Sequence, residues 1–326
     1  MMNKYIDVFN GDADGIFSLI QWRKAYSLTA QDQQILITGV KRDIALVSKI
    51  DDELAHLSKI TVLDISFDKN QEDVNRVLEH CQSLFYCDHH KADSLFEHPK
   101  LTSHINTKPT VCTGLLVNGE LKGEHSLWAI AAAFGDGLDS IADKYVAQLG
   151  LDTTQRHQLK ELGVLVNYNG YGSSVDDLHF SPEELYKRLV SYDTPFDVIV
   201  DENSPFRQLK EGYETDIAQA KNSKQLSQEG VIAVILNDAP WARRISGTYG
   251  NQLAAENPSQ PVIIVTLNAQ GSYTISLRAP KEHPHGASKI CSKFATGGGR
   301  EGAAGINQLP VEELDKFLDT VAKYYK

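Results

Sequence analysis

Acidic and imidazole side chains stand where three short apolar runs of this chain end. The side chains are Asp12 and Asp14 after residues 5–9, Asp64 after residues 60–63, and Asp88, His89 and His90 after residues 84–87. Carboxylate and imidazole ligands together suit Mn²⁺ or Mg²⁺. A pair of such ions is a common means of cleaving phosphate esters. The spacing therefore predicts one metal cluster at the edge of one sheet.

The first half of the chain predicts strands that alternate with helices. The expected strands are residues 5–9, 34–40, 60–63 and 84–87, and the expected helices are residues 16–28, 44–57 and 71–81. The strands are continuous apolar runs, as in a parallel sheet that is buried on both faces. This pattern predicts a doubly wound α/β domain, in which ligands bind beyond the carboxyl ends of the strands.

The second half predicts a mainly helical region and then a smaller α/β domain. The expected helices are residues 128–134, 140–149, 153–166 and 182–190, followed by a polar connecting helix at 206–228. The expected later elements are strands at 231–236, 262–266 and 273–277 and a last helix at 311–325, with Pro310 at its start. We therefore divide the chain into a catalytic domain (1–200), a linker helix (201–228) and a substrate-binding domain (229–326).

Composition limits the classes of function. The 326 residues are 41% hydrophobic and 23% charged, as in an ordinary soluble globular protein, and no apolar run is long enough to span a membrane. The four cysteines have no Cys-x-x-Cys spacing, so we expect reduced thiols and a cytoplasmic location. A net charge of -11 argues against binding to long nucleic acid and favours a small anionic substrate.

Further candidates lie outside the three strand ends. Asp136 follows an apolar helix, Arg278 ends an expected strand, and a glycine-rich segment runs through Gly297, Gly298, Gly299 and Arg300. Glycines let backbone N–H groups approach an anion, and arginine donates a fork of hydrogen bonds to phosphate. Tyr168 and Tyr171 could stack on a base, as could the segment from Trp241 to Arg244.

Taken one at a time, these features also have ordinary interpretations. Aspartate after a strand commonly caps the next helix. Adjacent histidines occur in solvated loops, arginines occur on ordinary surfaces, and glycine-rich segments form simple turns.

In combination and in this order, the motifs resemble the DHH phosphoesterase superfamily, in the branch with the DHH-associated C-terminal domain that includes nano-RNases and dinucleotide phosphodiesterases. The resemblance implies two Mn²⁺ ions, or Mg²⁺, in the N-terminal domain. The implied metal ligands are Asp12, Asp14, Asp64, His89 and Asp136, with Asp64 as the bridge. It also implies that Asp88 orients a ligand, that His90 faces the substrate phosphate, and that Arg278 and the glycine-rich segment hold the substrate.

Two positions depart from the pattern of the family. Many members have a histidine ligand of the first ion where this chain has Val8, so we expect a weaker first site or one that uses water. Many members also have histidine after the three glycines, where this chain has Arg300. The arginine favours a strongly anionic terminal group on the substrate.

The expected activity is hydrolysis of short linear oligonucleotides or dinucleotides, such as pGpG, to 5′-mononucleotides by two-metal hydroxide attack. The sequence leaves open a cyclic-dinucleotide phosphodiesterase, a 3′-phosphoadenosine 5′-phosphate phosphatase, a single-strand exonuclease and a non-catalytic nucleotide sensor. It also leaves open a homodimer, the base preference and the physiological metal.

Overall fold

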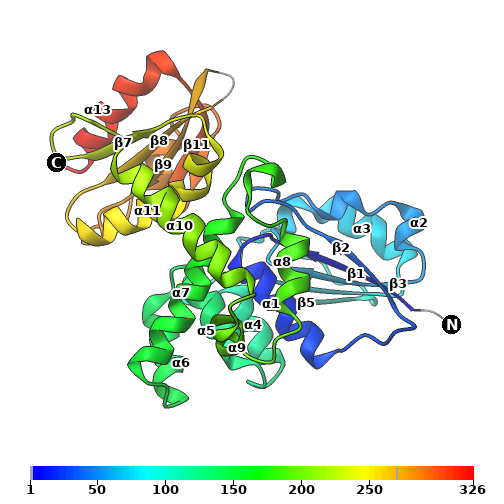
Figure 1. The fold of residues 1–326 in the computed structure, drawn as a ribbon. Coiled ribbons are helices and arrows are strands. Elements are labelled where there is room, and N and C mark those ends of the chain that lie inside the picture. Colours follow the sequence, from blue (N-terminus) through cyan, green and yellow to red (C-terminus); the bar gives the residue numbers. More distant parts are fainter. Residues whose placement is uncertain (1–2, 269–270) are drawn as a thin grey trace. The chain divides into compact units, whose positions relative to one another are not determined.

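The structure is a computed structural model that describes residues 3–268 and 271–326. The chain forms two compact units, Met1–Glu211 and Gly212–Lys326 (Figure 1). The division falls inside helix α10 (Pro205–Lys221), which contributes residues to both units. The expected linker of residues 201–228 contains this helix and also the short strand β6 (Lys224–Leu226).

The first unit contains a five-stranded sheet in the order β2-β1-β3-β4-β5. Its strands are β1 (Lys4–Phe9), β2 (Gln33–Ile37), β3 (Ser58–Leu63), β4 (Ser83–Asp88) and β5 (Leu101–Ile105). Every pair is parallel, so all the carboxyl ends lie at one edge. The sequence predicted four of these strands but not β5, and it extended β2 three residues too far.

Helices cover both faces of this sheet. Ile6 and Val8 of β1 join an apolar core with Val74 of α3, whereas Asp7, between them, points to the other face and pairs with Arg23 of α1. The helices concerned are α1 (Ala13–Ala25), α2 (Asp52–Ala55) and α3 (Gln71–His80). Figure 1 shows α1 on the opposite side of the sheet from α2 and α3. The predicted doubly wound architecture is confirmed.

The predicted continuous helix at residues 44–57 is wrong. The segment forms a 3₁₀ turn, Val47–Lys49, and then the one-turn helix α2. Ile50 between them is extended, and the Asp51 side chain accepts a hydrogen bond of 2.7 Å from the Leu54 N–H. Asp51 therefore starts a new helix rather than continuing the first.

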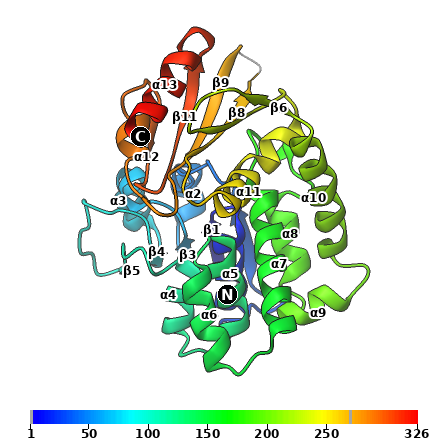
Figure 2. The same cartoon turned by 90° about the vertical axis from the view of Figure 1, so that its left-hand side faces the viewer.

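A second layer of helices lies beside α1 (Figure 2). These are α4 (Thr113–Glu120), α5 (Ser126–Gly135), α6 (Asp139–Gln148), α7 (Thr153–Gly170), α8 (Pro182–Leu189) and α9 (Pro195–Val200). Helices α4, α5, α7 and α8 pack against α1, α6 packs against α5, and α9 packs against α5 and α7. Trp128 of α5 lies with its ring centroid 5.5 Å from that of Phe17 of α1. Small residues let α5 and α7 approach closely, since a Cβ on Gly163 would lie 2.2 Å from the Ala131 carbonyl oxygen.

The second unit contains a mixed six-stranded sheet in the order β10-β11-β9-β8-β7-β6. Its elements after β6 are β7 (Ile232–Leu236), α11 (Pro240–Glu256), β8 (Val262–Leu267), β9 (Ser272–Arg278), α12 (Ala287–Cys291), β10 (Gly297–Gly299), β11 (Ala303–Pro310), a 3₁₀ turn (Val311–Glu313) and α13 (Leu314–Tyr324). Phe317 of α13 is buried against Phe294. The predicted smaller α/β domain is confirmed. Across the described residues of both units, no helix is long and apolar enough to cross a bilayer.

Candidate metal centre

Side chains from three segments of the first unit meet at the carboxyl edge of its sheet. Asp12 caps α1, Asp64 follows β3, Asp88 ends β4, and His89 follows it. All four side chains are buried, and the exposed fraction of Asp88 is 0%. The carboxylates are therefore held out of water. A buried negative charge is costly unless a cation or a hydrogen-bond donor compensates for it.

Asp14, in the first turn of α1, is held by the amino end of α4. Its Oδ2 accepts a hydrogen bond of 2.8 Å from the Thr113 N–H, and its Oδ1 accepts one of 2.7 Å from the Gly114 N–H. The amino end of a helix carries unpaired N–H groups and a partial positive charge, which favour a carboxylate. Each carboxylate oxygen keeps further lone-pair capacity for a cation.

Asp64 has the most perturbed environment of the centre. Its backbone is left-handed, with φ of 59°, a conformation that non-glycine residues adopt chiefly where the surroundings demand it. Its Oδ1 accepts a hydrogen bond of 3.1 Å from the Thr113 hydroxyl. Burial, and then the negative charges of Asp14 and Asp12, raise the pKa of Asp64 well above its usual range. A divalent cation beside Asp64 would relieve this repulsion.

His89 is oriented as a metal ligand. Its Nδ1 lies 3.1 Å from the Val111 carbonyl oxygen, so this nitrogen carries the proton and donates it. Its Nε2 is then free to accept, and it lies 3.5 Å from Asp64 Oδ1 and 3.8 Å from Asp14 Oδ2. A hydrogen bond from one imidazole nitrogen to a carbonyl commonly fixes the tautomer in which the other nitrogen binds a metal.

His90 is coupled to Asp88. Its Nδ1 lies 2.7 Å from Asp88 Oδ1 and 3.9 Å from Asp64 Oδ1. Burial on its own lowers the pKa of His90, but the hydrogen bond and charge of Asp88 raise it above the usual range. His90 is therefore predisposed to carry a proton beside an anionic group.

The donor atoms fit a divalent cation. One ligand atom from each of Asp64, His89 and His90 lies within 4.8 Å of the others. Among the described residues, Asp88 Oδ2 is a buried oxygen that accepts no hydrogen bond. Buried carboxylates with an imidazole between them form the oxygen-and-nitrogen set that Mn²⁺ accepts. Asp14 lies outside the tight set but faces the same His89 nitrogen.

The other two expected metal ligands, Asp12 and Asp136, do not belong to the group of Asp64, His89 and His90. Asp12 is bonded through Oδ2 to the ammonium of Lys41. Asp136 caps the carboxyl end of α5 and is half-buried. Burial alone lowers the pKa of Lys41, but the charges of Asp12 and Asp136 raise it above the usual range. Both carboxylates therefore act on Lys41.

Several residues of the site were not predicted from the sequence. Thr113 holds both Asp14 and Asp64, the Val111 carbonyl orients His89, and Lys41 pairs with Asp12. The one available signal was Thr113-Gly114 before an apolar run, which is a plausible helix start. The other contacts join residues far apart in the chain, and no local pattern marks them.

The predicted phosphate-binding residues come together in the second unit. β10, which consists of Gly297, Gly298 and Gly299, pairs with β11, and Ala303 of β11 lies opposite Arg278 of β9. The tight turn between β10 and β11 places the exposed Arg300 next to Ala303, with a hydrogen bond of 2.9 Å from the Arg300 N–H to the Ala303 carbonyl. One end of the sheet thus carries both arginines and an open glycine backbone, which together could bind an anion.

The glycines of this hairpin are required by its geometry. Gly299 has a φ of 142°, and a Cβ there would lie 2.5 Å from the Ala304 Cα. A Cβ on Gly297 would lie 2.0 Å from the Cys291 carbonyl oxygen. Gly298 has no such neighbour within 4 Å, so its backbone is the part that a ligand could approach.

The aromatic candidates differ in their accessibility. Tyr168 lies inside α7, which continues to Gly170, and its ring is fully buried with its hydroxyl 2.8 Å from His179 Nε2. This ring has no free face for a base. Tyr171, just after α7, is half-buried with the Lys41 ammonium 5.4 Å from its ring centroid. Trp241, in the second unit, lines a pocket of about 580 Å³.

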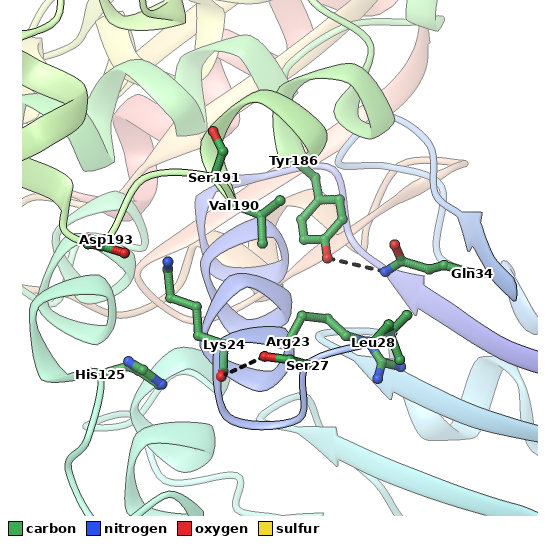
Figure 3. A pocket seen from close by; sticks show the side chains of 10 residues that line it. All are labelled: Arg23, Lys24, Ser27, Leu28, Gln34, His125, Tyr186, Val190, Ser191 and Asp193. Atoms are coloured by element: carbon green, nitrogen blue, oxygen red, sulfur yellow. Dashed lines mark hydrogen bonds between the residues drawn. The ribbon is translucent and has the colours of Figure 1, made fainter. Parts of the chain in front are cut away.

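A further pocket, of about 680 Å³, lies at the far end of α1 from the metal centre (Figure 3). Arg23, on its wall, is already paired with the buried Asp7. Gln34 donates a hydrogen bond of 3.2 Å to the Tyr186 hydroxyl across the pocket. Gln34 and Tyr186 are thus paired with each other, and the pocket contains none of the residues of the metal centre.

No protein-family model and no curated protein matches the chain, but solved structures match its fold. A DHH-domain member of the s1p family of ribosomal proteins is 13% identical with a TM-score of 0.66, over 99% of this chain and 86% of that one. The exonuclease RecJ bound to manganese is 14% identical with a TM-score of 0.60, over 99% and 90%. The pGpG-specific phosphodiesterase PggH from Vibrio cholerae is 12% identical with a TM-score of 0.52, over 99% and 98%.

These likenesses identify the fold. The chain has the two-domain fold of DHH-domain proteins, including the C-terminal domain. The resemblance that the motifs predicted is thereby confirmed at the level of the fold.

Proposed function

We propose that this protein is a divalent-metal-dependent phosphodiesterase that hydrolyses short linear oligonucleotides or dinucleotides, such as pGpG, to 5′-mononucleotides. The observation that carries the proposal is the convergence of Asp14, Asp64 and His89 at the ligand-binding edge of a parallel sheet, where His89 Nε2 lies 3.8 Å from Asp14 Oδ2 and 3.5 Å from Asp64 Oδ1. Asp14 faces the same His89 nitrogen from α1.

Asp14, Asp64 and His89 would hold the cation, and Mn²⁺ suits their oxygen and nitrogen atoms. The cation would supply a Lewis acid that activates water and neutralises charge on a phosphate ester. His90, whose Nδ1 lies 2.7 Å from Asp88 Oδ1, would donate a hydrogen bond to the phosphoryl oxygens. The expected second ion would depend on Asp12, whose Oδ2 is bonded to Lys41.

Two features support a short substrate. The net charge of -11 disfavours the tracking of a long polyanion, whereas a dinucleotide needs only a few placed cations. Arg278, Arg300 and the Gly298 backbone at one end of the second sheet provide such a site for a terminal phosphate. The likeness of the whole chain to PggH, a pGpG-specific phosphodiesterase, is consistent with this choice.

A substrate panel tests the proposal. Purified protein with Mn²⁺ is incubated with pGpG, pApA, a cyclic dinucleotide, 3′-phosphoadenosine 5′-phosphate and a long single strand, and the products are separated by chromatography. We expect the linear dinucleotides to be cleaved fastest and no cleavage in EDTA. Faster cleavage of the long strand would instead favour an exonuclease, the activity named for RecJ, which shares the fold. Tight binding without turnover would favour a sensor.

A further inference from the structure

Both carboxylate oxygens of Asp12 are engaged by this chain's own groups. Oδ1 accepts a hydrogen bond of 3.1 Å from the Gly15 N–H at the start of α1. Oδ2 is bonded to the ammonium of Lys41, on the loop after β2. Asp12 is only 3% exposed, whereas the Lys41 side chain is 26% exposed, so the carboxylate side of this ion pair is shielded from water. The cation next to Asp12 is therefore one that the sequence itself supplies.

The position of Lys41 is fixed by its backbone. Its N–H donates a hydrogen bond of 2.9 Å to the Gly170 carbonyl at the end of α7, and its carbonyl accepts one of 3.2 Å from Asn10 Nδ2. Gly170 lies directly against the Asp12 loop, since a Cβ on it would be 3.0 Å from the Asp12 Cα. Hydrogen bonds to Gly170 and Asn10 therefore fix the loop that carries Lys41. The contact between Lys41 and Asp12 is thus part of the fold.

The Lys41 ammonium contacts several groups at once, as a bound metal ion would. Besides Asp12, it donates a hydrogen bond of 3.2 Å to Asn167 Oδ1 and lies 5.4 Å from the centroid of the Tyr171 ring. Asn167 is 3% exposed, so its oxygen is also withdrawn from water. A lysine ammonium is a compact point charge with three donors, and it can neutralise a carboxylate. It cannot activate a water molecule as a Lewis acid does.

Val8 is consistent with the same interpretation. It is fully buried in the apolar core on one face of β1, and it has no atom that could bind a metal. The imidazole that the resemblance to the family leads us to expect at this position is therefore absent from the strand that leads to Asp12. His89, by contrast, supplies an oriented imidazole beside Asp64 and Asp14.

We propose that the Lys41 ammonium takes the place of the first metal ion, so that the centre binds one divalent cation per chain, on the side of Asp14, Asp64 and His89. The inference rests on the proposed function, because it concerns the number of ions in the same centre. It replaces the two-ion expectation with one metal ion and one fixed organic cation.

The number of bound Mn²⁺ ions tests this inference without any measurement of activity. Wild type and variants are equilibrated with saturating Mn²⁺, and bound metal is measured by equilibrium dialysis and by the loss of the free-Mn²⁺ electron paramagnetic resonance signal. We expect one ion in the wild type and two in Lys41→Met, which frees Asp12 Oδ2 and Asn167 Oδ1. Val8→His combined with Lys41→Met adds the missing imidazole, and we expect it to bind the second ion at least tenfold more tightly.

Lys59→Met is the matched control. Lys59 also lies over a tyrosine ring, with its Nζ 5.2 Å from the Tyr5 centroid, but at the opposite edge of the sheet. We expect one ion in this control, and circular dichroism should show that each variant is folded. Two ions in the wild type, or one ion in both Lys41 variants when folded, would overturn the inference. No bound ion in any of these proteins would instead overturn the proposed function.

Discussion

Replacement of Asp64 by asparagine should have opposite effects on stability with and without metal. In the metal-free protein, Asp64 is a buried carboxylate whose pKa is raised by burial and by the charges of Asp14 and Asp12. A carboxyl with a raised pKa binds its proton more tightly in the folded state, so its ionisation destabilises the fold as pH rises. Asp64→Asn removes this ionisation and should stabilise the metal-free fold at pH 8.

The size of the effect follows from the distances at His89. Asp64 Oδ1 and Asp14 Oδ2 lie 3.5 and 3.8 Å from the same Nε2, so they are at most about 7.3 Å apart. Two unit charges at this distance repel by about 2 kcal/mol at an effective dielectric constant near 20. Asparagine keeps an oxygen for the Thr113 hydroxyl but loses its attraction to His90. We therefore expect a net gain of about 1–2 kcal/mol in the free energy of unfolding.

Urea unfolding, followed by tryptophan fluorescence from the buried Trp128, measures this difference. In EDTA, Asp64→Asn should unfold at a higher urea concentration than the wild type. With Mn²⁺ at roughly 100 times its dissociation constant, the wild type should gain about 2.7 kcal/mol and the variant almost nothing. The order of stability should therefore reverse. Asp319→Asn, at an exposed position of the second unit, is the control and should change neither measurement.

Either of two results would refute this reasoning. Asp64→Asn could be less stable than the wild type in EDTA, which would mean that the Asp64 carboxylate is favourable in the metal-free fold. Mn²⁺ could also stabilise both proteins equally, which would exclude Asp64 from the metal ligands.

Three further predictions concern other parts of the chain. Asp88→Asn removes the carboxylate that holds His90 Nδ1 at 2.7 Å, so kcat should fall about 10–100-fold while bound Mn²⁺ is unchanged; an unchanged kcat would contradict this role. Arg300→Ala removes an exposed side chain that could donate hydrogen bonds to the substrate phosphate, so KM for pGpG should rise about tenfold or more with little change in kcat. An unaltered KM would show that Arg300 does not bind the substrate. Gly163→Ala places a Cβ 2.2 Å from the Ala131 carbonyl oxygen, so thermal unfolding should show a loss of about 1–3 kcal/mol; an unshifted Tm would show that α5 and α7 can separate freely.

The sequence predicted the parts of the fold that depend on local pattern. Mainly apolar runs, interrupted in β1 by Asp7, marked β1, β3 and β4, and the acidic residues after them marked the edge at which a parallel sheet binds ligands. Asp14, Asp64, His89 and His90 could be placed at one edge for this reason. Strand β5 was missed because Leu-Thr-Ser-His-Ile is a polar, half-exposed edge strand without an apolar run.

Other parts could not be predicted because they depend on contacts between distant segments. Lys41 meets Asp12 and Asn167 only when the loop after β2 packs against the end of α7. Tyr168 belongs to a glycine- and asparagine-rich segment that suggests a turn, yet α7 continues through it. The continued helix carries a fully buried Tyr168 ring, whose hydroxyl lies 2.8 Å from His179 Nε2.

The central claim is that Asp14, Asp64 and His89 hold a divalent cation. An anomalous difference map from a crystal soaked in Mn²⁺ tests it most directly. We predict one strong peak within bonding distance of Asp64 and His89 Nε2, and no peak beside Asp12 while Lys41 is present. A map with no peak at Asp64 and His89, at full Mn²⁺ saturation, would contradict the account.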